Sequence, residues 1–204
     1  MAYIGKVPKA VPLSTNDLAD NIITSAKIVD GTIATADISD GAVTSVKTTG
    51  VGGANTPSFS ARLSSSLTLA DNTATDVVFQ TEFFDVGSCY NNTTGVFTVP
   101  SGEGGKYCIS TNCYFLDANG NVSDMLLYMH STIGAASQDE VARAEATSNG
   151  TLFTQFNLTY TTILTLSAGD AIKIQAYADT NNSTSISLKH GARNSVFSAF
   201  KIIE

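Results

Sequence analysis

The pattern of apolar and polar positions changes character near residue 57. From there on, apolar residues alternate with polar ones in short runs about ten residues apart, with almost no helical periodicity. Turn-forming residues such as Asp71-Asn72 separate the runs. We predict strands at residues 59–63, 67–69, 76–84, 96–99, 106–115, 125–130, 152–166, 171–177, 186–188 and 196–203, and a loop at 137–146. The pattern therefore indicates an all-β sandwich over residues 57–204.

Residues 14–50 form a different pattern, a repeat of ten residues. Its units read STNDLADNII, TSAKIVDGTI, ATADISDGAV and the degenerate TSVKTTGVGG. One apolar row recurs every five positions, at Leu18, Ile23, Ile28, Ile33, Ile38 and Val43. Asp30-Gly31 and Asp40-Gly41 favour turns with positive φ, so each unit is predicted to be two short extended pieces joined by a turn. A single copy cannot bury this row, which favours chains that intertwine.

The repeat resembles the stalk repeats of bacteriophage tail fibres, in which three chains wrap around a shared apolar axis. The resemblance implies a short repetitive β stalk whose trimer core is the apolar row. A flexible, low-complexity linker is the alternative interpretation. Residues 1–13 are predicted to be an anchoring arm with Tyr3 and Ile4 as its apolar anchors, or else a frayed terminus. Residues 51–56 are the expected hinge before the head, residues 57–204.

One stretch of the head carries a second resemblance. Its aromatic residues, glycines and proline follow one another in a fixed order: Tyr90, Gly95, Phe97, Pro100, Gly105 and Tyr107. The flanks agree in order, with Phe59 in an opening strand, Gly169 in a late hairpin and Phe197 in a closing strand. Together they resemble the C1q/TNF-like globular domain, although Ala199 stands where a glycine is usual. The resemblance implies a ten-stranded jelly roll that forms a compact homotrimer.

Charge and composition narrow the possible partners. The net charge is −7, about −1 before residue 56 and −6 after it, and no basic patch is evident, so nucleic-acid binding is not expected. No apolar run is long enough for a membrane-spanning helix, and Lys6, Pro8, Lys9 and Pro12 interrupt any signal-peptide core. The abundance of Ser, Thr, Asn, Ala and Gly suits extracellular or virion β-proteins.

The cysteines give little support for a disulfide framework because their number is odd. Cys108 and Cys113 lie five residues apart on one predicted strand and so point to opposite faces. A pairing of Cys89 with either is geometrically possible, but we expect all three to be reduced and buried.

The sequence shows no pattern of a catalytic or metal site. His130 and His190 lie far apart, with no cysteine or carboxylate at metal-ligand spacing. Asp139 and Glu140 are conceivable as the carboxylates of a glycan hydrolase, but adjacent acids in a polar loop are usually solvated. No catalytic activity and no cofactor are expected. The resemblance to C1q-like relatives raises calcium binding by Asp170 and Asp179, without ligand spacing to support it.

The two resemblances together suggest a function. We expect a trimeric bacteriophage virion protein, a tail fibre or fibre-like appendage, made in the host cytoplasm without a signal peptide and anchored to other virion proteins by its N-terminus. Its head is expected to contact a host-surface glycan or protein through loops at 133–150 and 179–194. The second loop carries the candidate receptor-binding side chains Asn181, Asn182, Lys189, His190, Arg193 and Asn194. The alternatives are a capsid decoration or head fibre protein and, less favoured, a polysaccharide-degrading enzyme.

Overall fold

The computed structural model describes residues 23–44, 47, 55–131, 139–150, 152–191 and 195–202. The chain divides into two compact units, residues 1–49 and residues 50–204. Among the described residues, no helix is both long enough and apolar enough to cross a membrane. The predicted anchors Tyr3 and Ile4, and Leu18 of the apolar row, lie outside the described residues.

The N-terminal unit repeats one backbone arrangement every ten residues. Residues 23–44 contain the single-turn 3₁₀ helices η2 (Ser25–Lys27) and η3 (Thr35–Asp37). Lys27 N and Asp37 N each donate to the carbonyl oxygen three residues earlier, both at 2.9 Å. Gly31 and Gly41 have φ angles of +79° and +76°, a region that favours glycine. The predicted turns at the two Asp-Gly pairs are therefore confirmed.

The rest of each repeat differs from the prediction of two short extended pieces. Ile28 and Ile38 are extended, with φ angles of −107° and −112°. A 3₁₀ turn, which was not predicted, precedes each of them. Over residues 23–44 and 47 the structure contains no β-strand. The described part of the ten-residue repeat is thus built from turns and extended residues, not from paired strands.

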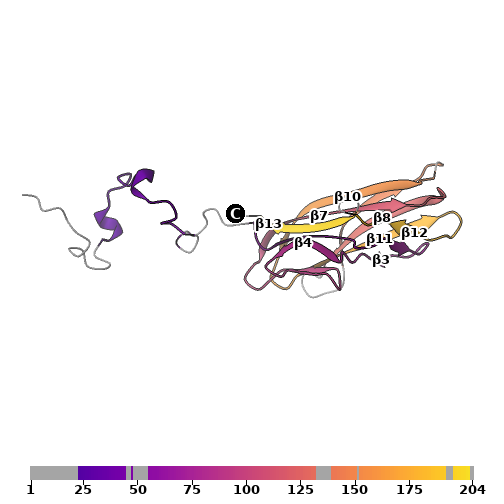
Figure 1. Cartoon of the computed structure of the whole chain (residues 1–204), viewed down its shortest axis with the longest axis horizontal. Coiled ribbons are helices and arrows are strands. Elements are labelled where there is room, and N and C mark those ends of the chain that lie inside the picture. Colours follow the sequence, from indigo (N-terminus) through magenta and orange to yellow (C-terminus); the bar gives the residue numbers. More distant parts are fainter. Residues whose placement is uncertain are drawn as a thin grey trace, which may run out of the picture. The chain divides into compact units, whose positions relative to one another are not determined.

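The head is a sandwich of two antiparallel sheets (Figure 1). The strands of the larger one, sheet A, are β1 (Ser58–Arg62), β2 (Leu67–Leu69), β4 (Thr81–Val86), β7 (Gly105–Leu116), β10 (Gln155–Leu166), β12 (Ile186–Leu188) and β13 (Val196–Lys201). Their order is β2-β12-β7-β13-β1-β4, and β10 pairs along the whole length of β7. The two longest strands of the head thus lie side by side at one edge of sheet A.

The second sheet, sheet B, has six strands. They are β3 (Thr75–Asp76), β5 (Tyr90–Asn91), β6 (Val96–Thr98), β8 (Val122–Ser131), β9 (Asp139–Thr147) and β11 (Ala171–Thr180). Their order is β5-β6-β11-β8-β9, and β3 pairs with Gln175 and Ala176 in the middle of β11. The described residues thus contain thirteen strands, several of them only two or three residues long, where the resemblance implied ten.

The head has two distinct ends. At the base, Lys201 N donates to Pro57 O at 3.1 Å and Ile202 N donates to Lys106 O at 2.8 Å, which brings both chain ends of the head together. At the far end, Asn181 N donates to Asn121 O at 3.0 Å and so joins the β11–β12 turn to the β7–β8 turn (Figure 1). The head therefore has both of its chain ends at one end and these turns at the other.

The core between the sheets is rich in stacked aromatic rings. The Phe59 ring lies 4.5 Å from the Tyr90 ring, 4.9 Å from the Phe197 ring and 5.4 Å from the Phe97 ring. Phe197 also packs on Phe79, with ring centroids 5.7 Å apart. All five are buried, and burial of each such ring contributes roughly 1.5–3 kcal/mol. This cluster joins strands from both sheets and fixes their stacking.

Two predicted boundaries were wrong. Residues 139–147, predicted to be a loop, form β9, whose Ala142, Ala144 and Ala146 pair with the core-facing Met129, Leu127 and Met125 of β8. Alanine favours helices, so the alternation was masked until pairing with β8 supplied the context. The predicted strand 76–84 is divided into β3 and β4, which belong to different sheets.

Candidate functional site

The outer face of sheet A is the most distinctive surface of the head. Side chains facing away from the core form rows across β4, β1, β13, β7 and β10. Next to the exposed pair Lys106 and Thr165 at the base, the first row across all five strands contains Val86, Ser58, Phe200, Cys108 and Ile163. Val86 is 47%, Phe200 40% and Ile163 60% exposed. A row of half-exposed apolar side chains is more typical of a surface that contacts another molecule than of a surface that faces solvent.

The next row of sheet A consists mainly of hydroxyl groups. It contains Phe84, Ser60, Ser198, Ser110 and Thr161. The Ser110 Oγ and Thr161 Oγ1 atoms lie 2.9 Å apart and hydrogen-bond to each other. Neither row carries a charge. The small side chains leave a flat central strip on which another β-sheet can pack closely.

A third row follows and carries one positive charge, Arg62 beside Val196 and Asn112. The Arg62 guanidinium lies 5.7 Å from the centre of the Phe83 ring, on the neighbouring strand β4. A cation over an aromatic face is favourable even without a carboxylate. The charge therefore sits at the border of the uncharged rows and does not divide them.

The outer face of sheet B has the opposite character. Its cross-strand neighbours on β11, β8 and β9 include Lys173, His130, Glu140, Gln175, Tyr128, Arg143, Glu145, Asp179 and Asp124. Lys173 Nζ lies 3.0 Å from Asp76 Oδ1, and Arg143 Nη2 lies 3.4 Å from Glu145 Oε2. Burial raises the pKa of Asp76, but hydrogen bonds from Gln175 and Lys173 outweigh it and hold the pKa below its usual value. This is a solvated, charged face.

The far-end receptor residues predicted from the sequence do not form a single loop. Asn181 and Asn182 are exposed in the turn after β11, at the far end. Lys189 and His190 follow β12, where Lys189 N donates to Tyr114 O at 2.9 Å and His190 Nδ1 lies 3.1 Å from Ser66 Oγ. The strand β12 separates the two pairs. Arg193 and Asn194 lie outside the described residues.

The predicted loop at 133–150 is also corrected. Its residues 139–147 are the strand β9, and residues 148–150 lie beside β8, where Ser148 N donates to Ser123 O at 2.7 Å. The far end is thus formed by the turns 117–121 and 181–185 and by the connection between β9 and β10. Amide and hydroxyl side chains dominate the two turns.

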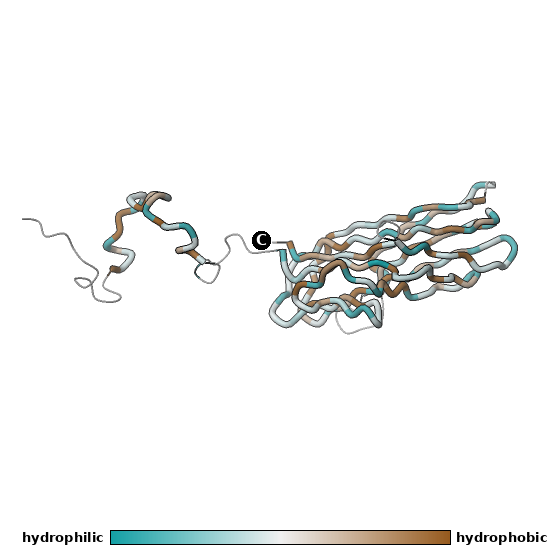
Figure 2. Tube along the Cα trace, in the orientation of Figure 1, coloured by the Kyte–Doolittle hydropathy of each residue, from teal (hydrophilic) through white to brown (hydrophobic). Residues whose placement is uncertain are grey.

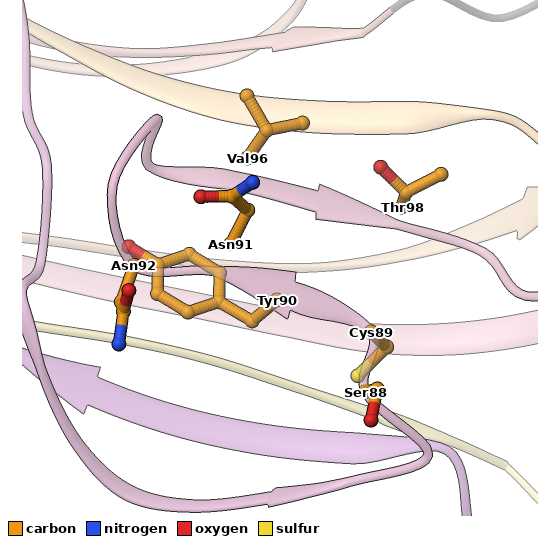
Figure 3. A pocket seen from close by; sticks show the side chains of 7 residues that line it. All are labelled: Ser88, Cys89, Tyr90, Asn91, Asn92, Val96 and Thr98. Atoms are coloured by element: carbon orange, nitrogen blue, oxygen red, sulfur yellow. The ribbon is translucent and has the colours of Figure 1, made fainter.

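A surface hollow of about 470 Å³ lies beside the hairpin of β5 and β6 (Figure 3). Its lining residues are Ser88, Cys89, Tyr90, Asn91, Asn92, Val96 and Thr98. Burial and a hydrogen bond to Asp85 raise the pKa of the Cys89 thiol to about 12. The thiol is therefore protonated at neutral pH and is not a nucleophile. Asn91 Oδ1 accepts hydrogen bonds from Thr93 N and Thr94 N, so this amide oxygen stabilises the turn between β5 and β6.

The remaining cysteines are free as well. Cys113 is buried, and burial raises the pKa of its thiol to about 12. Cys108 is only partly buried, contrary to the expectation that all three would be buried, because it faces the outer side of sheet A. The opposite orientations of Cys108 and Cys113 follow from their odd spacing on β7.

The signature residues of the head lie in or next to the core. Phe59, Phe97, Tyr107 and Phe197 are fully buried, and the Tyr90 hydroxyl donates to Phe79 O and accepts from Phe79 N, both at 3.1 Å. Burial raises the pKa of Tyr90 above its ordinary value.

The glycines and the proline of the signature occupy turns and strand ends. Gly95 has a φ angle of +76°, and a Cβ there would lie 3.0 Å from Val77 O, so no other residue fits without displacement. Gly169 lies in the β10–β11 turn, where its N–H donates to Val99 O at 2.9 Å. Pro100 follows β6, and Gly105 begins β7.

The carboxylates considered for calcium or catalysis are not brought together. Asp170 lies at the base, where its Oδ2 atom accepts from Ser167 N at 2.8 Å, and Asp179 lies at the other end of the same strand. Nine residues of strand span roughly 30 Å, so the two cannot share one ion. Within the described residues no group of three or more metal-ligating side chains is close enough to hold a metal. Glu140 pairs with Arg143 at 3.8 Å on an exposed strand.

The apolar row of the stalk is exposed in the single chain. Ile23, Ile28, Ile33, Ile38 and Val43 are between 43% and 54% exposed. Figure 2 shows these hydrophobic positions recurring along the described part of the unit, separated by hydrophilic ones. Every described residue of the repeat is exposed, so residues 23–44 and 47 do not form a core within the single chain.

Two stacked antiparallel sheets in this strand order define a jelly-roll head of the C1q/TNF type. The chain belongs to the C1q domain family, since the family model described as C1q domain matches residues 58–202. No curated protein matches the chain in sequence.

Solved structures show the same fold. The globular domain of zebrafish complement 1qA is 17% identical, with a TM-score of 0.51 over 72% of this chain and 97% of that chain. The Eiger TNF of S. frugiperda is 14% identical, with a TM-score of 0.53 over 71% and 90% of the two chains. Murine APRIL is 14% identical, with a TM-score of 0.53 over 71% and 98%. At these identities the likeness shows the fold.

The uncharged rows of sheet A are a candidate functional feature that the sequence analysis missed. One signal was available: Phe197 and Phe200 lie three residues apart on one strand, so they must point to opposite faces. The adjacent Phe83 and Phe84 carry the same signal, since at least one of them must face outward. What the sequence alone did not give is the register that aligns Phe200 and Phe84 with Ile163 on other strands.

Proposed function

We propose that this protein is a homotrimeric structural component of a bacteriophage particle. Residues 1–13 anchor it to other virion proteins, residues 14–50 form a three-chain stalk, and the C1q-like head contacts the host surface. The observation that carries the proposal is the outer face of sheet A. Its apolar and hydroxyl rows suit packing against identical faces, and the C1q/TNF-like resemblance leads to the same trimer.

The stalk supports the same symmetry. An unbroken row of half-exposed isoleucines is unfavourable in a single chain, and three chains around one axis bury it. Complete burial of an isoleucine side chain contributes roughly 1.5–3 kcal/mol to stability. Burial of two such side chains, for example Ile28 and Ile33, in each of three chains therefore stabilises the trimer substantially. The ten-residue repeat with no core of its own resembles phage fibre stalks in this respect.

Replacing both Ile28 and Ile33 by aspartate is expected to open the stalk while the head stays folded. Trypsin is the suitable probe, because Lys27 and Lys47 lie within the repeat. The wild-type stalk should resist cleavage at these lysines, and the variant should be cut there, leaving the intact head. A control with Val29 and Thr35 changed to aspartate, outside the apolar row, should stay resistant. Equal cleavage of wild type and both variants would refute the stalk.

The far end of the head is the proposed contact with the host. If the base faces the stalk, the turns with Asn119, Asn121, Asn181 and Asn182 project outward. Their amide groups donate and accept hydrogen bonds without a charge of their own, which suits host-surface glycans or polar protein surfaces.

Deleting residues 1–13 is expected to yield a trimer that no longer joins the particle. The measurement is the amount of the protein in purified particles from cells that supply either form. The virion protein that binds the full chain but not the truncated chain then distinguishes a tail location from a capsid location. Normal incorporation of the truncated protein would contradict the anchoring role.

A further inference from the structure

The stalk repeat carries charges of alternating sign at one position. The fourth residue of the four successive units is Asp17, Lys27, Asp37 and Lys47. The seventh residue behaves differently: it is Asp20, Asp30 and Asp40 in the first three units. The sign of the charge is thus constant at the seventh position of the first three units and alternates at the fourth position.

The alternating charges occupy equivalent places in the backbone. Lys27 N, Asp37 N and Lys47 N donate to the carbonyl oxygens of Thr24, Ala34 and Thr44 at 2.9, 2.9 and 2.8 Å. Lys27 and Asp37 each end a 3₁₀ turn, and all three side chains are exposed. The same local structure therefore accepts either charge.

Turn preference and local hydrogen bonding account for the constant charge and for one of the alternating charges. Asp30 and Asp40 precede the glycines of the turns, where aspartate is favoured. Asp37 Oδ2 also has a local role, since it accepts a hydrogen bond from Ala34 N at 2.9 Å. That bond would favour an acid in every unit, yet lysine occupies the equivalent position at 27 and 47. An alternation with a period of two units is the pattern that contacts between successive units of neighbouring chains would produce.

We propose that each stalk unit packs against the following unit of a neighbouring copy, so that position four of one chain meets position four, one repeat further along, of the next. This inference rests on the proposed three-chain stalk. Lys27 of the first chain then faces Asp37 of the second chain. That Asp37 in turn faces Lys47 of the third chain. Packing of equal residue numbers would instead bring three identical charges together, which is unfavourable. The exposed stalk surface is therefore covered by a second and a third copy of the chain. Each chain is shifted by one repeat relative to the neighbour that it contacts.

Co-expression of the full chain with a charge-reversed full chain tests the packing. The reversed chain carries Asp17→Lys, Lys27→Asp, Asp37→Lys and Lys47→Asp, which preserves both the net charge and the alternation. A short mass tag on one chain allows native mass spectrometry to count mixed and unmixed trimers. One-repeat packing places like charges together only in mixed trimers, so these should be depleted roughly fivefold below the binomial expectation at low salt. The depletion should fade at high salt.

Each other outcome overturns the inference. Enrichment of mixed trimers would mean that equal residue numbers face each other, and a binomial distribution would mean that position four makes no contact between chains. A third chain with glutamine at all four positions is the control and should mix freely with wild type. If wild type itself is not a trimer by light scattering, the proposed function fails and the packing with it.

Trypsin resistance provides a second measurement that does not depend on mixing. The fully reversed chain alone should resist cleavage in the repeat as wild type does. The single change Lys27→Asp places three acids in succession at 17, 27 and 37 and should open the stalk at low salt, which is measured as cleavage at Lys47, the one lysine left in the repeat of this variant. An equally resistant Lys27→Asp variant would contradict the packing, and its head serves as the internal standard for folding.

Discussion

Replacing Thr161 by arginine is expected to convert the head from trimers to monomers. Thr161 is exposed on β10, in the hydroxyl row of sheet A and hydrogen-bonded to Ser110. In a single chain, an arginine at this position extends into water. In the proposed trimer it would introduce a charge into an uncharged interface, which costs several kcal/mol per copy. Light scattering on residues 56–204 measures the outcome directly.

The matched control is Thr147→Arg on β9. Thr147 is also an exposed threonine, but it belongs to the charged face of sheet B, where its hydroxyl donates to Asp124 Oδ1 at 2.9 Å. This variant should remain a trimer. Dissociation by both variants, or by neither, would show that the rows of sheet A are not the interface.

Replacing Phe197 by alanine is expected to lower the free energy of unfolding of the head by roughly 3–5 kcal/mol. Its ring is fully buried and contacts Phe59, Phe79 and Tyr90 from both sheets, so the truncation leaves a cavity where the sheets meet. The measurement is urea unfolding in the monomeric Thr161→Arg background, which removes the contribution of assembly.

Phe200→Ala in the same background is the control for this cavity. Phe200 lies on the same strand, three residues away, but faces outward and is 40% exposed. Its removal should change the free energy of unfolding of the monomer by less than about 1 kcal/mol. If the two changes have equal effects, the assignment of inner and outer faces to β13 is wrong.

Much of the head followed from its local pattern. The alternation around Tyr107, Ile109 and Cys113 located β7, because this strand buries one face along nearly its whole length. The run around Leu158 and Leu164 located β10, because its more and less exposed positions alternate even though only Leu158 and Leu166 are buried. β9 was missed for the opposite reason. Its core positions are alanines, whose small size and helix preference give little strand signal before they meet the large side chains of β8.

The candidate surface depended on information that a single strand does not contain. Phe84, Phe200 and Ile163 lie on three strands far apart in sequence, and only the register of sheet A brings them to one face. Similarly, the expected receptor residues seemed to share a loop, but the pairing of β12 with β2 and β7 separates Asn182 from Lys189.

The stalk was predictable in its period and not in its conformation. The spacing of Ile28, Ile33 and Ile38 and the Asp-Gly turns were visible in the sequence. The 3₁₀ turn before Ile28 and Ile38 was not, since Ser-Ala-Lys and Thr-Ala-Asp have no strong preference for a single helical turn.

The most direct test of the account is the solution mass of the wild-type protein, measured by light scattering on the full chain and on residues 56–204. The account predicts three times the chain mass for both, which for the full chain is three times 21.3 kDa. A monomeric head would contradict it, because the apolar and hydroxyl rows of sheet A would then stay open to water.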